Sequence, residues 1–113
     1  MALEHQTRGA TSDPAIADPK HFRVVSETPK VRVLRLRFGP HEKSVMHWHP
    51  AMIVVLLADC HLRYTYQDGT SAEVIAKRGQ VLDFPEAVHR LENLSDRRFE
   101  AVRIELKEGK GAR

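Results

Sequence analysis

Cysteine is almost absent from this chain of 113 residues, which contains Cys60 alone. A single cysteine forms no internal disulfide and cannot build a zinc site that needs several thiolates, so Cys60 is expected to be a small buried hydrophobe. Long apolar runs are also missing. The longest, from Ala51 to Ala58, is far too short to cross a membrane and is typical of one buried strand.

The first residues lack the charged-then-apolar layout of a secretory signal, so a cytoplasmic protein is expected. Apolar residues make up 42% of the chain and charged residues 29%, which is the balance of a folded globular protein. A chain of this length forms one domain with a single core.

Charge of one sign is not concentrated anywhere in the chain. The net charge is +3 and the pI is near 9.3, yet most basic residues alternate with acidic ones. Only Arg32, Arg35 and Arg37 cluster, along one expected strand, and no aromatic residues are interleaved with them to stack on bases. These features argue against a nucleic-acid partner.

The chain is expected to be all-β, because short apolar or alternating runs follow one another between Gly, Pro and Asp turns. Asp68-Gly69 is the clearest hairpin turn, and no segment has a sustained helical period. Residues 1–20 are predicted to be a flexible arm, 21–107 a barrel, and 108–113 a disordered tail. The expected strands are 22–25, 31–38, 44–49, 52–58, 61–66, 73–76, 81–84, 89–94 and 99–106.

Histidines at two separated points are the most informative residues of the sequence. His47 and His49 flank Trp48, and side chains of a strand alternate faces, so these two histidines point the same way. By the same alternation His89 shares a face with Asn93. Three neutral imidazoles that meet in a cavity form a site for a first-row metal with at least one position open.

These motifs resemble those of a small single-domain cupin, an RmlC-like barrel of the double-stranded β-helix or jelly-roll type. The first cupin motif corresponds to Gly39 through His47-Trp48-His49, with two extra residues after the glycine. The second corresponds to Gly79, Pro85, His89 and Asn93, with one residue fewer between the proline and the histidine. The resemblance extends over about residues 20–107.

The glutamate of the cupin motif is absent, since Ile53 or Val54 stands at its place. The resemblance therefore implies a three-histidine variant with His47, His49 and His89 as metal ligands. Without the carboxylate the complex carries one more positive charge, which favours an anionic or electron-rich ligand in the open positions. The ligand set does not choose between iron, zinc, nickel, manganese and copper.

Other polar residues have smaller predicted roles. Asn93 is expected either to orient His89 or to cap a strand end. Tyr64 is expected to form a wall of the pocket, and Trp48 to point away from the histidines. His41 and His61 are predicted to be solvated loop residues.

Three functions fit these residues. One is a metal-dependent enzyme, either a dioxygenase or a Lewis-acid lyase or isomerase, that acts on a small anionic or enolisable ligand. Another is a non-catalytic small-molecule-binding or sensory barrel, and the third is a metal-free barrel with structural histidines. A homodimer is expected in each case, formed through the arm or an apolar sheet face, because one small barrel does not cover every apolar side chain of Met52 to Leu57.

Overall fold

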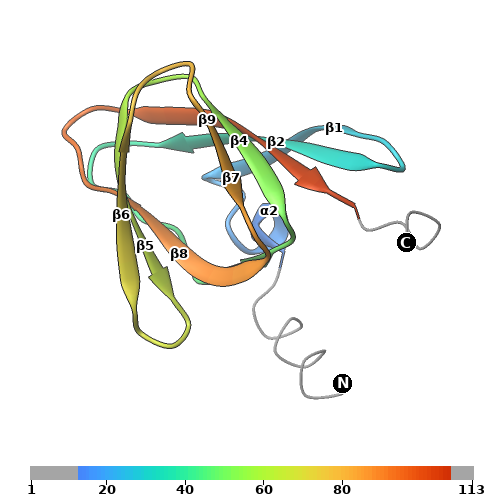
Figure 1. Ribbon diagram of the computed structural model, residues 1–113, viewed down its shortest axis with the longest axis horizontal. Helices are drawn as coiled ribbons and strands as arrows, with labels where there is room; N and C mark the ends of the chain where they lie inside the picture. Colours follow the sequence, from blue (N-terminus) through green and yellow to red (C-terminus); the bar gives the residue numbers. More distant parts are fainter. Residues whose placement is uncertain (1–12, 108–113) are drawn as a thin grey trace.

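Two antiparallel sheets form the protein in the computed structural model, which describes residues 13–107. Figure 1 shows the sheets facing each other around a common interior. The elements in chain order are α2 (Pro14–Ala17), β1 (Phe22–Glu27), β2 (Val31–Phe38), β3 (His47–His49), β4 (Met52–Leu56), β5 (Cys60–Tyr66), β6 (Ser71–Ala76), β7 (Val81–Phe84), β8 (Ala87–Asn93) and β9 (Phe99–Leu106). The all-β prediction is confirmed.

The strand order in each sheet shows how distant parts of the chain meet. The five-stranded sheet has the order β1-β2-β9-β4-β7, and the four-stranded sheet has the order β3-β8-β5-β6. Pairs far apart in sequence therefore dominate: β2 pairs along its whole length with β9, and β3 pairs with β8. This arrangement of two antiparallel sheets with pairings between distant strands is a jelly roll, as the spacing of the strands predicted.

The core lies between the sheets and follows the alternation of the strands. Leu34, Leu36 and Phe38 of β2 are all buried, whereas Arg35 and Arg37 between them point outward. Each fully buried Leu or Phe contributes roughly 1.5–3 kcal/mol to folding. The run from Ala51 to Ala58 was expected to be a buried strand, and this holds for one face only: burial alternates along Met52–Leu56, because only one face of β4 meets the opposite sheet.

A single helical turn precedes the first strand, although no helix was predicted. Asp13 is its N-cap and accepts a hydrogen bond from the Ala15 amide, and Pro14 occupies the first turn, where its missing N–H costs nothing. The turn packs against β1 and β3 (Figure 1). The folded unit therefore begins before residue 21; residues 1–12 of the predicted arm and the predicted tail, 108–113, lie outside the described residues.

The predicted hairpin turn is confirmed at Asp68-Gly69, between β5 and β6. The Gly69 amide donates to the carbonyl of Tyr66, and Gly69 has a φ of 92°. Only glycine adopts this conformation at no steric cost. Among the described residues, no helix is long and apolar enough to cross a membrane.

Candidate metal centre

The three predicted ligands come from two paired strands. His47 of β3 lies opposite His89 of β8 in the antiparallel register, and His49 lies opposite Ala87. Their side chains all point into the barrel and are at most 1% exposed. The ring centroids of His49 and His89 are 4.4 Å apart, those of His47 and His89 4.9 Å, and those of His47 and His49 6.4 Å.

Hydrogen bonds fix which nitrogen is free on two of these rings. Nδ1 of His47 donates to the carbonyl of Val45 at 3.0 Å, and Nδ1 of His49 donates to that of Pro50 at 2.7 Å. A proton on Nδ1 leaves the lone pair of Nε2 available. The Nε2 atoms of His47, His49 and His89 are all buried, and among the described residues none has a hydrogen-bond partner.

The surroundings keep all three rings neutral. Burial, followed by the positive charge of Arg103, lowers the pKa of His47 to about 3 and that of His49 to about 4. Burial, and then the charges of the two other histidines, lowers the pKa of His89 still further below its usual range. Neutral imidazole is the form that binds metal ions.

The three rings are near one another, but they are not arranged as the ligands of a bound metal ion are. Among the described residues, no three His, Cys, Asp or Glu side chains are gathered as a bound ion would hold them. The spacing of His47 and His49, 6.4 Å between centroids, is the widest of the three. Three rings at metal–nitrogen distances of about 2 Å and near-tetrahedral angles would have centroids about 5 Å apart. An ion bound by all three rings would therefore need the rings of His47 and His49 to lie closer together than they do here.

Aromatic rings line the space beside the histidines. The ring of Tyr64 lies 4.9 Å from that of His89, and Phe22 lies at the same distance from His47. Tyr64 is 3% exposed, and burial raises the pKa of its hydroxyl well above the usual value. The prediction that Tyr64 lines the interior is confirmed.

Arg103 also lies in the interior, which the sequence analysis did not predict. Alternation along β9 separated Arg103 and Glu105 from Val102 and Ile104, and a charged pair belongs by default on the solvated face. In the structure Arg103 and Glu105 are buried, while the two aliphatic residues lie half-buried on the outer face. The available signal was their parity with Phe99 and Ala101, two apolar residues of β9 that are fully buried.

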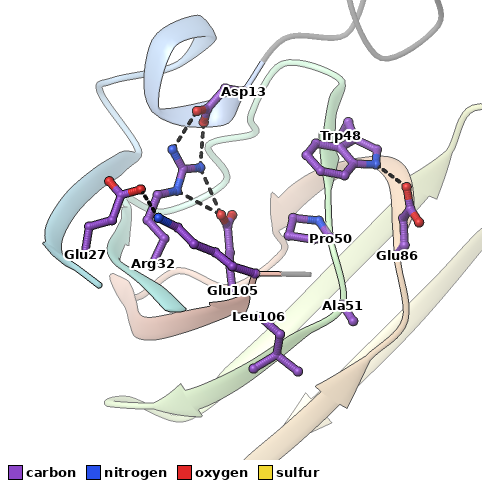
Figure 2. A pocket seen from close by; sticks show the side chains of 10 residues that line it. Asp13, Glu27, Arg32, Trp48, Pro50, Ala51, Glu86, Glu105 and Leu106 are labelled. Atoms are coloured by element: carbon purple, nitrogen blue, oxygen red, sulfur yellow. Dashed lines mark hydrogen bonds and ion pairs between the residues drawn. The ribbon is translucent and has the colours of Figure 1, made fainter. Parts of the chain in front are cut away.

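A cleft of about 640 Å³ opens next to Pro50, which follows His49 in the chain (Figure 2). On one side Arg32 bridges two carboxylates, Asp13 at 2.6 Å and Glu105 at 2.9 Å. On the other side the indole N–H of Trp48 donates to Glu86 at 2.7 Å. Trp48 points away from the histidines, as predicted. The remaining lining residues are Glu27, Ala51, Leu106 and Lys107.

Asn93 does not orient His89, so that alternative was wrong. Its amide nitrogen donates to the carbonyls of Gly39 and Arg97, and its oxygen accepts from Ser95. Asn93 therefore fastens the end of β8 to two turns, which is the strand-end role that was the other expectation.

His41 and His61 lie away from the site. His41 is exposed and bonds Asp96, and His61 is exposed and bonds Glu73, although His61 lies on β5 and not in a loop. Cys60 is buried, and burial raises the pKa of its thiol, as expected of a packing residue.

The sheets and the position of the histidines define a cupin barrel, and comparison with solved structures agrees. A cupin domain from Bordetella pertussis Tohama I is similar, with 30% identity and a TM-score of 0.70 over 77% of this chain and 92% of that one. An RmlC-like cupin family protein from Methanocaldococcus jannaschii has a double-stranded β-helix fold and 15% identity, with a TM-score of 0.62 over 80% of this chain and 83% of that one.

A likeness to KdgF from Halomonas sp. extends over 81% of this chain and 82% of that one, at 11% identity and a TM-score of 0.55, and shows the fold alone. No family model matches the sequence, and no curated protein does. The similarity to the Bordetella domain shows the family: the chain belongs to the cupins.

Proposed function

We propose that this cupin binds one divalent transition metal through His47, His49 and His89, and that its barrel admits a small anionic or enolisable ligand to that metal. The observation that carries the proposal is the set of three buried Nε2 atoms without hydrogen-bond partners among the described residues. Leaving a buried polar atom unpaired costs about 1–3 kcal/mol, and three such atoms face one space here. A metal ion would satisfy all three at once.

The bonds to Val45 and Pro50 support this assignment over structural histidines. A ligand imidazole needs its second nitrogen held by a carbonyl or carboxylate, which sets the tautomer and the ring orientation. His47 and His49 have such bonds to backbone carbonyls. Purely structural histidines would be expected to use both nitrogens, as His21 does with Asp18 and Glu42.

Three neutral ligands leave the full charge of the ion uncompensated, which favours an anion as the additional ligand. The metal would supply Lewis-acid activation of a carbonyl or, as ferrous iron, activation of dioxygen. The chain supplies the rest: the carbonyls of Val45 and Pro50 hold two rings, and the apolar faces of Phe22 and Tyr64 keep water from the histidines. We propose an enzyme of this kind.

Metal binding is tested by elemental analysis of protein purified without a histidine tag, followed by titration of the metal-free protein with Co²⁺. One ion per chain is expected, and His47→Ala should weaken binding by at least about 10-fold, as removal of a ligand does. His61→Ala, at an exposed histidine bonded to Glu73, is the matched control and should bind Co²⁺ like the wild type.

Absence of metal from the wild type, or equal losses in the two variants, would contradict the proposal. Bound metal without turnover of any small acid or diketone would favour the binding or sensory barrel instead.

A further inference from the structure

Arg103 is a buried charge with too few partners. It is 1% exposed, and within residues 13–107 its only hydrogen bond is a long one, 3.5 Å from Nη1 to Glu105 Oε2. Its Nε is buried with no partner in that same part of the chain. A guanidinium has five N–H donors, and burying it unpaired is costly. The side chain is therefore built to meet a group that the protein itself does not supply.

The residues paired with Arg103 on the two adjacent strands offer no side-chain acceptor. Its register partners are Leu34 on β2 and Val54 on β4, both buried and aliphatic. Glu105 is shared, because its other oxygen binds Arg32 at 2.9 Å. One carboxylate thus serves two guanidinium groups. Asp13 completes the neutralisation of Arg32 and leaves Arg103 the less compensated of the two.

Arg103 lies next to the candidate metal centre. Its guanidinium carbon is 4.9 Å from the centroid of Phe22, and the same ring contacts His47. Its positive charge also contributes to lowering the pKa of all three histidines. Of the two residues that could occupy the place of the cupin glutamate, Val54 faces inward and is paired with Arg103. The guanidinium therefore faces the region from which a carboxylate is missing.

The geometry points to Arg103 as the residue that binds the carboxylate of a small acid whose neighbouring oxygen, nitrogen or sulfur reaches the metal. This inference rests on the proposed function, since it takes the three histidines as the ligands. A carboxylate matches the planar fork of a guanidinium in a two-point contact, and one negative charge balances one guanidinium. Arg32 and Lys107, the other cations near the site, are already paired with carboxylates.

The cleft of Figure 2 is the route by which a small acid would reach Arg103. Glu105 lines the cleft, as Figure 2 shows, and the same side chain bonds the buried guanidinium of Arg103. The lining has two cations, Arg32 and Lys107, and four carboxylates, Asp13, Glu27, Glu86 and Glu105, so the charge that would hold an anion is that of Arg103, which is bonded to Glu105.

The test uses the full chain loaded with Co²⁺ and follows the visible absorption of the metal during titration with glycolate. Arg103→Met keeps the volume and removes the charge, and it should weaken glycolate binding by about 30-fold or more. The affinity for Co²⁺ should stay equal or increase in this variant, because a nearby positive charge is gone. A merely structural arginine would lower both affinities together. Arg103→Lys, which keeps the charge without the fork, should give intermediate glycolate binding.

Three controls complete the design. Arg63→Met removes an arginine from the outer face of β5 and should change neither affinity. Glycolamide, the uncharged analogue, should bind wild type and Arg103→Met equally, and phosphate should bind more weakly than glycolate. Equal glycolate affinity in wild type and Arg103→Met would overturn the inference, and so would tighter binding of phosphate than glycolate.

If the wild type takes up no Co²⁺, the proposed function fails by itself. Stabilisation of the metal-free protein by glycolate, measured as a shift in Tm, then tests Arg103 directly. A shift in wild type that is lost in Arg103→Met supports the anion site, and equal shifts overturn it. If Arg103→Met does not fold, the comparison of Arg103→Lys with wild type decides in the same way.

Discussion

Each of the three buried histidines prefers its neutral form, and this makes the stability of the metal-free protein depend on pH. The pKa is 6.5 for an ordinary histidine and about 3 and 4 for the folded forms of His47 and His49. Below pH 6.5 the unfolded chain binds protons that the folded chain refuses, so the free energy of unfolding falls as the pH falls. The slope approaches about 1.4 kcal/mol per pH unit for each histidine.

Urea unfolding of the metal-free protein between pH 7 and pH 4.5 measures this effect. Burial raises the pKa of Tyr64, the phenol closest to His89, well above that range, so the three histidines should dominate. The triple variant His47→Gln, His49→Gln, His89→Gln should show a much flatter dependence. A slope equal to that of the wild type would show that these rings are protonated in the folded state.

At the residue scale the sequence identified the histidines and missed the arginine, for one physical reason. Alternation along a strand states which residues share a face, but not which face is inside. In β3 the two histidines share one face and Trp48 lies on the other. The second histidine motif, around His89, indicated that the histidine face points inward. For β9 the alternation separates Arg103 and Glu105 from the aliphatic residues, and the free-energy cost of burying charge favours the outer face for the charged pair. Phe99 and Ala101, of the same parity, bring Arg103 and Glu105 inside with them.

The hairpin between β5 and β6 gives a prediction at the scale of the element. Gly69 has a φ of 92°, and although nothing would clash with an added Cβ, an L side chain is strained in this conformation. Gly69→Val should therefore lower the stability by about 1 kcal/mol or more. A thermal melt measures the change, with Gln67→Val at the neighbouring exposed position as the control. Equal Tm values for the two variants would show that the turn is not under this constraint.

The strands were predictable because alternating apolar residues and turn residues mark each of them. The helix α2 was missed, although its first residues also have a recognisable pattern. Strands 31–38, 81–84 and 99–106 agree with the structure at both ends. Asp13 followed by Pro14 is a standard helix start, but four residues are too short to show a helical period. The role of Asn93 could not be resolved from the sequence, because its partner Gly39 is 54 residues away in the chain and becomes a neighbour only in the folded barrel.

The outer face of the five-stranded sheet gives a prediction at the scale of the whole molecule. Val33 of β2, Ile104 of β9 and Ile53 of β4 form one row across three strands, and Val102 lies beside Val55 in the next. These side chains are only half-buried in one chain, and a second copy would cover them by two-fold symmetry. We therefore expect a homodimer that uses this face.

Light scattering at micromolar concentration should give about twice the mass of the 12.9 kDa chain. Ile104→Lys, at the centre of the row, should shift the protein to the monomer, whereas Ile75→Lys, on the exposed β6 strand of the other sheet, should not. A wild type that scatters as a monomer would exclude the dimer.

Strand β3 is three residues long, lies at the edge of its sheet, and has β8 as its only strand partner there. Two of the three histidines therefore reach the third only when a pairing between segments about 40 residues apart has formed. Contacts of such long separation form slowly, because the intervening chain must first be ordered. In refolding experiments, the appearance of Co²⁺ absorption would thus time the closure of the barrel itself. A one-residue slip of β3 against β8 would turn Trp48 inward and both histidines outward. A chain misfolded in this way would bind no Co²⁺ and would be detected by the missing absorption.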